Sequence, residues 1–144
     1  MKPREFLNRI QHAEIVAAIQ AAEAKTSGEI RVCISHHVID DPIDAAKREF
    51  AHLGMSATKA RNGVLIYVAP RTRRFAIIGD EGVHSHCGEV FWREVADAMS
   101  ARFRRGDYTE GIVHGIRTAG ELLARHFPPS GEDRNELSDG IAGD

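Results

Sequence analysis

Hydrophobic positions in the first half of the chain follow helical spacing, then strand spacing, then helical spacing again. Residues 8–25 carry apolar side chains three or four positions apart, which predicts a helix with one buried face. Residues 29–36 alternate apolar with more polar side chains, which predicts a strand. A second helix is expected after Asp41, a suitable N-cap, with Pro42 at its first position. We expect Ile43 on the buried face of that helix.

The middle of the chain contains its most apolar stretch, residues 64–69. A strand that is apolar on both faces is typical of the centre of a sheet covered on both sides. Residues 74–79 form the next apolar stretch, and only residues 70–73 separate the two. That link is too short for a parallel crossover, so we expect an antiparallel hairpin.

Two further helices are expected in the second half, the first over residues 83–105 or 88–105 and the second over residues 107–126. Asp107 and Glu110 have the spacing of a capping box at the start of the last helix. The element order is then αβαββαα, and a helix joins the first two strands, which favours a parallel pair. The predicted fold class is α/β, with a small mixed β-sheet, made of a parallel pair plus an antiparallel hairpin, between helices.

The end of the chain differs in composition from the rest. Residues 128–144 begin with two prolines and carry five acidic residues against one arginine. This predicts a flexible acidic C-terminal tail after a single α/β domain over residues 1–127. Leu137 and Ile141 leave open the alternative that the tail docks back on the domain.

Composition narrows the function classes. The chain has 144 residues and a formal net charge of −2, so it is not a strongly basic protein, which argues against nucleic acid as a partner. No apolar run approaches the roughly 18–20 residues of a membrane span, so no transmembrane segment is expected. The N-terminal residues lack a signal-peptide core, and the two cysteines form no Cys-x-x-Cys pair. We therefore expect a cytoplasmic protein.

The predicted topology gathers oxygen-bearing side chains at one end of the sheet, where the first two strands begin and the third ends. The candidate metal ligands there are Glu29, Asn62, Asp80 and Glu81. Calcium takes six to eight oxygen ligands from carboxylates, amides and backbone carbonyls, so a Ca²⁺ or Mg²⁺ site is one interpretation. The other interpretation is that these residues form ordinary turns, because glycines lie next to them in the sequence.

The opposite end of the sheet is rich in arginine, from the hairpin turn and from the end of the third helix. The candidate anion-binding residues are Arg71, Arg73, Arg74, Arg102, Arg104 and Arg105. Such a cluster can hold phosphates, a lipid headgroup or RNA backbone. The alternatives are solvated charges that meet a helix dipole, or an intramolecular contact with the acidic tail.

Other catalytic signatures are missing from the sequence. No phosphate-binding glycine loop or serine-nucleophile motif occurs, so we expect no nucleotide cofactor and can name no catalytic residue. The zinc-ligand types at His84, His86 and Cys87 are expected at the opposite end of the sheet from His36 and His37, which argues against a shared zinc site. Whether the protein is an enzyme stays open.

Four segments of the chain resemble the TPM domain family, which is named for a thylakoid lumen protein, a photosystem repair protein and a worm receptor regulator. They are residues 26–32, 61–68, 75–82 and 103–111. Residues 135–141 resemble the end of a subgroup of small, stand-alone bacterial members. The resemblance implies an α/β/α sandwich and a divalent-cation site, often for calcium. For some plant members it also implies phosphatase activity.

Three functions follow as hypotheses. The first is a cytoplasmic module that binds a divalent cation, calcium or magnesium. The second is a weak metal-dependent phosphatase that acts on phosphate esters, with Arg61 as an anion clamp. The third is an interaction module whose arginine end holds an acidic protein, a phosphate-bearing ligand, a lipid headgroup or RNA.

Overall fold

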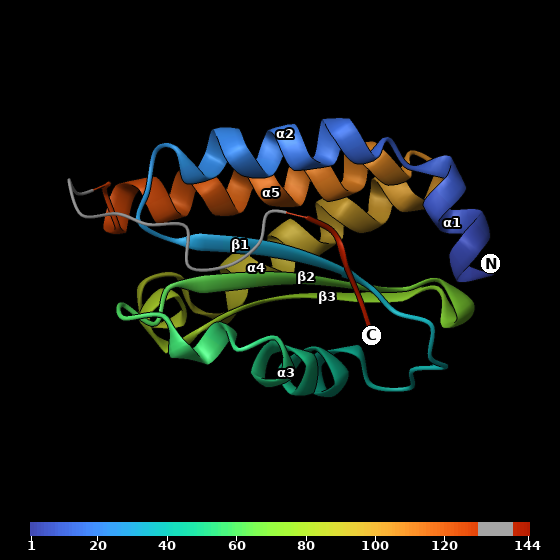
Figure 1. Cartoon of the computed structure of the whole chain (residues 1–144), viewed down its shortest axis with the longest axis horizontal. Helices are drawn as coiled ribbons and strands as arrows, with labels where there is room; N and C mark the ends of the chain where they lie inside the picture. The colour runs from blue at the N-terminus through green and yellow to red at the C-terminus, as the bar shows by residue number, and fades with distance from the viewer. Residues whose placement is uncertain (130–139) are drawn as a thin grey trace.

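The computed structural model describes residues 1–129 and 140–144. A four-stranded sheet in the order β3-β2-β1-β4 lies between two layers of helices (Figure 1). The strands are β1 (Glu29–Ile34), β2 (Gly63–Ala69), β3 (Arg74–Gly79) and β4 (Ala142–Gly143). The helices are α1 (Pro3–Arg9), α2 (His12–Glu23), α3 (Pro42–His52), α4 (Glu81–Arg104) and α5 (Tyr108–His126), with short 3-10 turns at Met55–Ala57 and Pro70–Thr72.

The strand pairing confirms the predicted mixed sheet. β1 runs parallel to β2, from the pair Glu29 and Gly63 to the pair Ile34 and Val68. β2 and β3 form the expected antiparallel hairpin, which Pro70–Thr72 connects. The α/β fold class is therefore confirmed, while the observed order has one more helix at its start and a short strand, β4, at its end.

Strand β2 is buried along its whole length because helices cover both faces of the sheet. Ile66 and Val68 contribute to the main core under α2, α4 and α5. Leu65 and Tyr67 point to the other face, where they meet a second core under α3. The period-two alternation of strand side chains thus divides one apolar strand between two cores, and this is the expected α/β/α sandwich.

Three local expectations were wrong. The first predicted helix is two helices, α1 and α2, because the backbone at Ile10 is extended. Ile43 is 54% exposed, since it lies in the first turn of α3, before the buried residues that begin at Ala45. Asp107 makes no side-chain cap to α5 and instead accepts a hydrogen bond from Arg105 Nε at 3.2 Å. The predicted cap of α3 is confirmed, with Asp41 Oδ1 accepting from two backbone N–H groups at 3.1 Å.

The third predicted helix begins at Glu81, before both of the expected starts at residues 83 and 88. α4 starts at Glu81 and runs through Gly88, whose backbone is not helical, with φ of 70° and ψ of 178°. A positive φ of this size is one that glycine adopts readily. Gly88 therefore marks a kink between two helical segments rather than the start of the helix.

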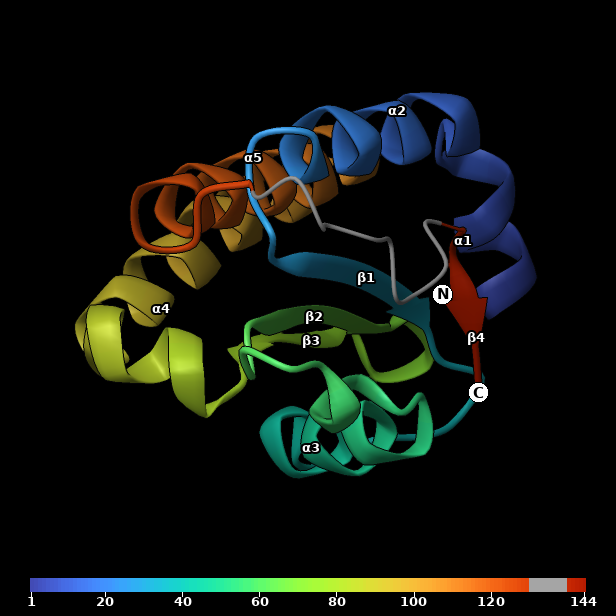
Figure 2. The same ribbon diagram turned by 60° about the vertical axis from the view of Figure 1, so that its left-hand side comes forward.

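The last residues of the chain lie against the domain. β4 pairs in parallel with the end of β1, with Ala142 beside Cys33 and Gly143 beside Ile34 (Figure 2). Ile141 contacts the main core, as the docking alternative expected, whereas Leu137 lies outside the described residues. The boundary between domain and tail at residue 127 stays a prediction. No helix within residues 1–129 or 140–144 is long and apolar enough to span a membrane.

Candidate functional site

Three of the four predicted oxygen ligands meet at one end of the sheet. Glu29, Asn62 and Asp80 are 3%, 2% and 7% exposed. Backbone hydrogen bonds join their segments, from Glu29 N–H to the Asn62 carbonyl at 3.4 Å and from Asp80 N–H to the Gly63 carbonyl at 2.9 Å. The fourth residue, Glu81, projects outward with 85% of its side chain exposed.

The carboxylate of Asp80 is engaged by two partners. Arg61 donates from Nε to Oδ2 at 2.9 Å and from Nη2 to Oδ1 at 3.1 Å, a two-point ion pair. Asp80 Oδ1 also accepts from the backbone N–H of Glu81 at 2.7 Å, which caps α4. The hydrogen bond and the charge of Asp80 raise the pKa of Arg61 above its ordinary value. The guanidinium is thus the cation that Asp80 holds in this arrangement.

A close backbone approach keeps Arg61 beside α4. Gly82 N–H donates to the Arg61 carbonyl at 2.9 Å. A Cβ at position 82 would lie 2.5 Å from the carbonyl oxygen of Ala60 and 2.6 Å from that of Arg61, closer than real side chains come. Arg61 itself has a φ of 51°, in the left-handed region. A glycine at position 82 is therefore what allows the Arg61 loop to lie on the first turn of α4.

The donor set fits a divalent cation in type but not in arrangement. Within residues 1–129 and 140–144, no group of three or more His, Cys, Asp or Glu side chains is placed to hold a metal. The amide of Asn62 donates to Ser27 Oγ at 3.3 Å, and both Asp80 oxygens face Arg61. A cation at this end would have to compete with a guanidinium for the same carboxylate.

At the other end of the sheet, three of the six predicted arginines line one pocket. Arg73, Arg74 and Arg104 lie around a cavity of about 470 Å³. Arg74 Nη1 donates to the Asp40 carbonyl at 2.8 Å. In the part of the chain that the structure describes, no acidic side chain pairs with any of the three. We call this cavity the arginine pocket.

The other three predicted arginines make local contacts instead. Arg71 Nε donates to the His36 carbonyl at 2.7 Å, and Arg102 Nη1 donates to the carbonyl one turn earlier in α4 at 2.9 Å. Arg105 pairs with the side chain of Asp107. The predicted six-arginine cluster is therefore divided, and half of it faces the arginine pocket.

Aromatic side chains line the arginine pocket, and sequence reasoning missed them. They come from four segments: Phe6, Phe75, Phe103 and Tyr108. Phe75 and Phe103 meet edge to face with ring centroids 5.0 Å apart, and Phe6 and Tyr108 lie 5.0 Å apart. The sequence held one sign of this aromatic lining: Phe103 and Tyr108 flank Arg104 closely along the chain.

A second contact missed in the sequence ties the chain end to the sheet. Asp144 accepts hydrogen bonds from Ser35 Oγ at 2.5 Å, from Tyr67 OH at 2.8 Å and from His36 N–H at 2.8 Å. Ser35 is fully buried and Tyr67 is 2% exposed, so Asp144 partners two hydroxyls that have little access to water. No ion pair between Asp144 and an arginine is formed within the described residues. The acidic tail thus reaches the arginine end through Asp144 without neutralising an arginine there.

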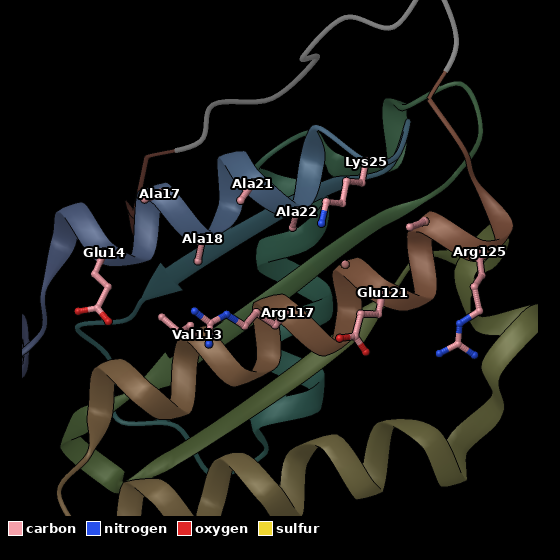
Figure 3. Close-up of a pocket in the computed structure, with 12 residues that line it drawn as sticks. Glu14, Ala17, Ala18, Ala21, Ala22, Lys25, Val113, Arg117, Glu121 and Arg125 are labelled. Atoms are coloured by element: carbon pink, nitrogen blue, oxygen red, sulfur yellow. The ribbon is translucent and has the colours of Figure 1, made fainter.

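Another hollow lies between α2 and α5, with a volume of about 740 Å³. Figure 3 shows short alanine side chains from α2 facing charged side chains of α5, such as Arg117 and Glu121. The two helices approach closely at Gly120, where an added Cβ would lie 2.8 Å from the Cβ of Ala22. None of the predicted site residues lines this hollow.

The family can be decided by comparison with known proteins. A family profile described as TPM domain matches residues 1–122. The chain belongs to the TPM domain family. The resemblance predicted from four short segments is therefore confirmed, and the TPM domain includes both ends of the sheet described above.

Solved structures agree with this TPM domain. The BA42 protein from the psychrophilic bacterium Bizionia argentinensis is 39% identical, with a TM-score of 0.83 over 94% of this chain and 95% of that one. The N-terminal domain of a protein from P. gingivalis is 22% identical, with a TM-score of 0.63 over 79% and 76% of the two chains, and shows the same fold. No curated protein matches the chain. The BA42 match fits the predicted subgroup of small bacterial members.

Proposed function

We propose that this TPM domain is a binding module that holds an anionic ligand in the arginine pocket. One observation supports the proposal: Arg73, Arg74 and Arg104 line the same cavity, and no acidic side chain of the described residues pairs with them. Guanidinium groups present planar, two-point donors that match phosphate and carboxylate oxygens. An anion would therefore gain charge-assisted hydrogen bonds from guanidinium donors other than Arg74 Nη1, which already donates to the Asp40 carbonyl.

The attraction between an anion and the protein would come from the arginines of the pocket and not from the net charge, since the chain as a whole is slightly acidic. Binding at such a site weakens as salt screens the exposed guanidinium charges. A phosphate-bearing small molecule or the acidic side chain of a partner protein has the required chemistry. The predicted compartment, the cytoplasm, stays a prediction.

The test is an amide NMR titration with inorganic pyrophosphate at low and at near-physiological salt. Saturable shifts are expected around residues 73–75 and 103–105, with weaker binding at the higher salt. Arg104→Gln should weaken binding about fivefold, the effect of losing roughly 1 kcal/mol. Arg93→Gln, at an exposed position on the same helix, is the control and should bind as the wild type does. Equal losses in both variants, or no saturable shift at the arginine pocket, would overturn the proposal.

A second candidate function is divalent-cation binding at the oxygen end. The burial of Glu29, Asn62 and Asp80 at one end supports it. Because Arg61 shares the carboxylate of Asp80, Ca²⁺ or Mg²⁺ would have to displace the guanidinium. Arg61→Gln should then tighten cation binding, and the double variant Asp80→Ala with Glu81→Ala should abolish it.

An amide NMR titration with Ca²⁺ and then Mg²⁺ measures both variants and the wild type. Saturable shifts near residues 29, 62 and 80–82, strengthened by Arg61→Gln, would support the cation site. If every variant shows only unsaturated shifts spread over exposed carboxylates, the candidate cation site is ruled out.

Phosphatase activity is not part of the proposal. The oxygen end and the arginine pocket lie at opposite ends of β2, a strand of seven residues that spans about 20 Å. A cation at one end could not contact a phosphoryl group at the other. Arg61, the expected anion clamp, is already engaged by Asp80.

A further inference from the structure

We infer that the ligand of the arginine pocket is a small organic anion that carries an aromatic ring, or an apolar group of similar size, next to its charge. This inference rests on the proposed function. It follows from the aromatic side chains that line the same cavity as the three arginines. An inorganic anion would use only the arginines and leave the aromatic surface exposed to water.

The aromatic residues form a connected chain of rings. Phe6 contacts Tyr108, Tyr108 lies 6.2 Å from Phe103 between ring centroids, and Phe103 contacts Phe75. Phe6 is 4% exposed, whereas the other three rings are only partly buried and line the cavity. Partly buried rings offer apolar surface whose removal from water favours binding, and ring edges and faces attract another ring.

Packing against α5 holds the ring of Phe103 in the aromatic wall. The ring of Phe103 lies against α5 at Gly111, where a Cβ would come 2.4 Å from Phe103 Cε1. The absence of a side chain at Gly111 therefore lets this ring lie close to the helix. A fixed apolar wall lowers the ordering cost of binding.

The size of the cavity favours a small molecule over a macromolecular surface. Its volume of about 470 Å³ falls in the range of sites that enclose one metabolite-sized ligand, about 300–1,000 Å³. The arginines and the aromatic residues line one cavity, so a single molecule bound there can contact both. A polyanion such as RNA needs a longer basic surface.

Phenylphosphonate and methylphosphonate test the inference, because they share a headgroup and differ only in the apolar part. Affinities come from amide NMR titrations of the full chain under identical salt. We expect phenylphosphonate to bind at least about tenfold more tightly, since burial of the ring adds a favourable apolar contribution. Equal affinities would overturn the inference and leave the proposed function standing, whereas no binding of either compound would overturn both.

Variants of the pocket separate the two contributions. Phe103→Leu should reduce the preference for phenylphosphonate over methylphosphonate to about threefold or less, because the phenyl group loses its aromatic contact. Arg104→Gln should weaken both ligands by a similar factor. If Phe103→Leu fails to fold, Tyr108→Leu removes a neighbouring ring and has the same expected outcome. A phenyl preference that persists in the folded ring variants would place the ligand elsewhere and contradict the inference.

Discussion

The hydroxyl of Tyr67 donates a hydrogen bond of 2.8 Å to the carboxylate of Asp144, across 77 positions of sequence. Ser35 and the backbone N–H of His36 donate to the same carboxylate. Because β4 pairs with β1 over only two residues, these side-chain contacts hold the chain end as much as the strand ladder does. The docking of β4 should therefore depend on the charge of Asp144.

Acid should release β4. Partial burial by itself raises the pKa of Asp144, but the hydrogen bonds from Ser35, His36 and Tyr67 outweigh burial and hold the pKa below its ordinary value of 3.8. A group with a lowered folded-state pKa contributes stability that is complete above the ordinary pKa and is lost as the pH falls through the folded-state value. The amide signals of His36 and Gly143 should shift together below about pH 3.8 in an NMR titration. The Asp144→Asn variant should lack this transition, and the same transition in both proteins would contradict the assignment.

Gly82 should be difficult to replace. In Gly82→Ala the new Cβ would collide with two backbone carbonyl oxygens, at 2.5 and 2.6 Å, and backbone cannot move aside cheaply. We expect a loss of about 1–3 kcal/mol in the free energy of unfolding, measured by urea denaturation. Gly63→Ala is the control at the same end of the sheet, because its nearest neighbours stand 3.4 Å away and include the flexible end of Met55. It should cost less than about 1 kcal/mol. Similar losses in the two variants would contradict the close-approach argument.

The two cysteines should differ in reactivity. Burial, followed by the charges of Glu49 and Asp144, raises the pKa of Cys33 to about 12, so about one molecule in 10⁴ carries the thiolate at pH 8. Burial also raises the pKa of Cys87, which is only partly buried. A thiol-specific reagent at about pH 8 should label Cys87 slowly and Cys33 only after a denaturant is added. In Cys87→Ser the folded protein should give no labelling, and rapid labelling of that variant would show that Cys33 is accessible.

The strands were predictable because their signals are local. Residues 74–79 were predicted with the bounds that the structure gives to β3, and the apolar residues of β2 indicated its central place. β4 was not predictable in the same way, since Ala142 and Gly143 show no alternation and their pairing partners lie over 100 positions earlier. Non-local pairing leaves no mark in a short window of sequence.

The sequence predicted at which end of the sheet each candidate site lies, but not how the side chains there contact one another. Topology brought Arg61 and Asp80 to one end, but the sequence could not show that the arginine would take the carboxylate proposed for a cation. Likewise, the arginine end was located from the hairpin turn, while its aromatic wall comes from residues in α1, β3, α4 and α5 that share no sequence pattern. Side-chain pairing and convergence depend on three-dimensional packing.

The short length of β4 has a consequence for how this protein behaves in concentrated solution. β4 pairs with β1 only at Cys33 and Ile34, whereas nearer the start of β1 the backbone N–H of Ile30 donates to Glu23 Oε2 at 2.8 Å. An open edge of an apolar strand is a template on which another molecule can add its own strand. A chain that ends before residue 140 would leave Cys33 and Ile34 without the strand that pairs with them, so it should self-associate at concentrations where residues 1–144 stay monodisperse by light scattering. The pairing of β4 with β1 would then protect the protein from aggregation.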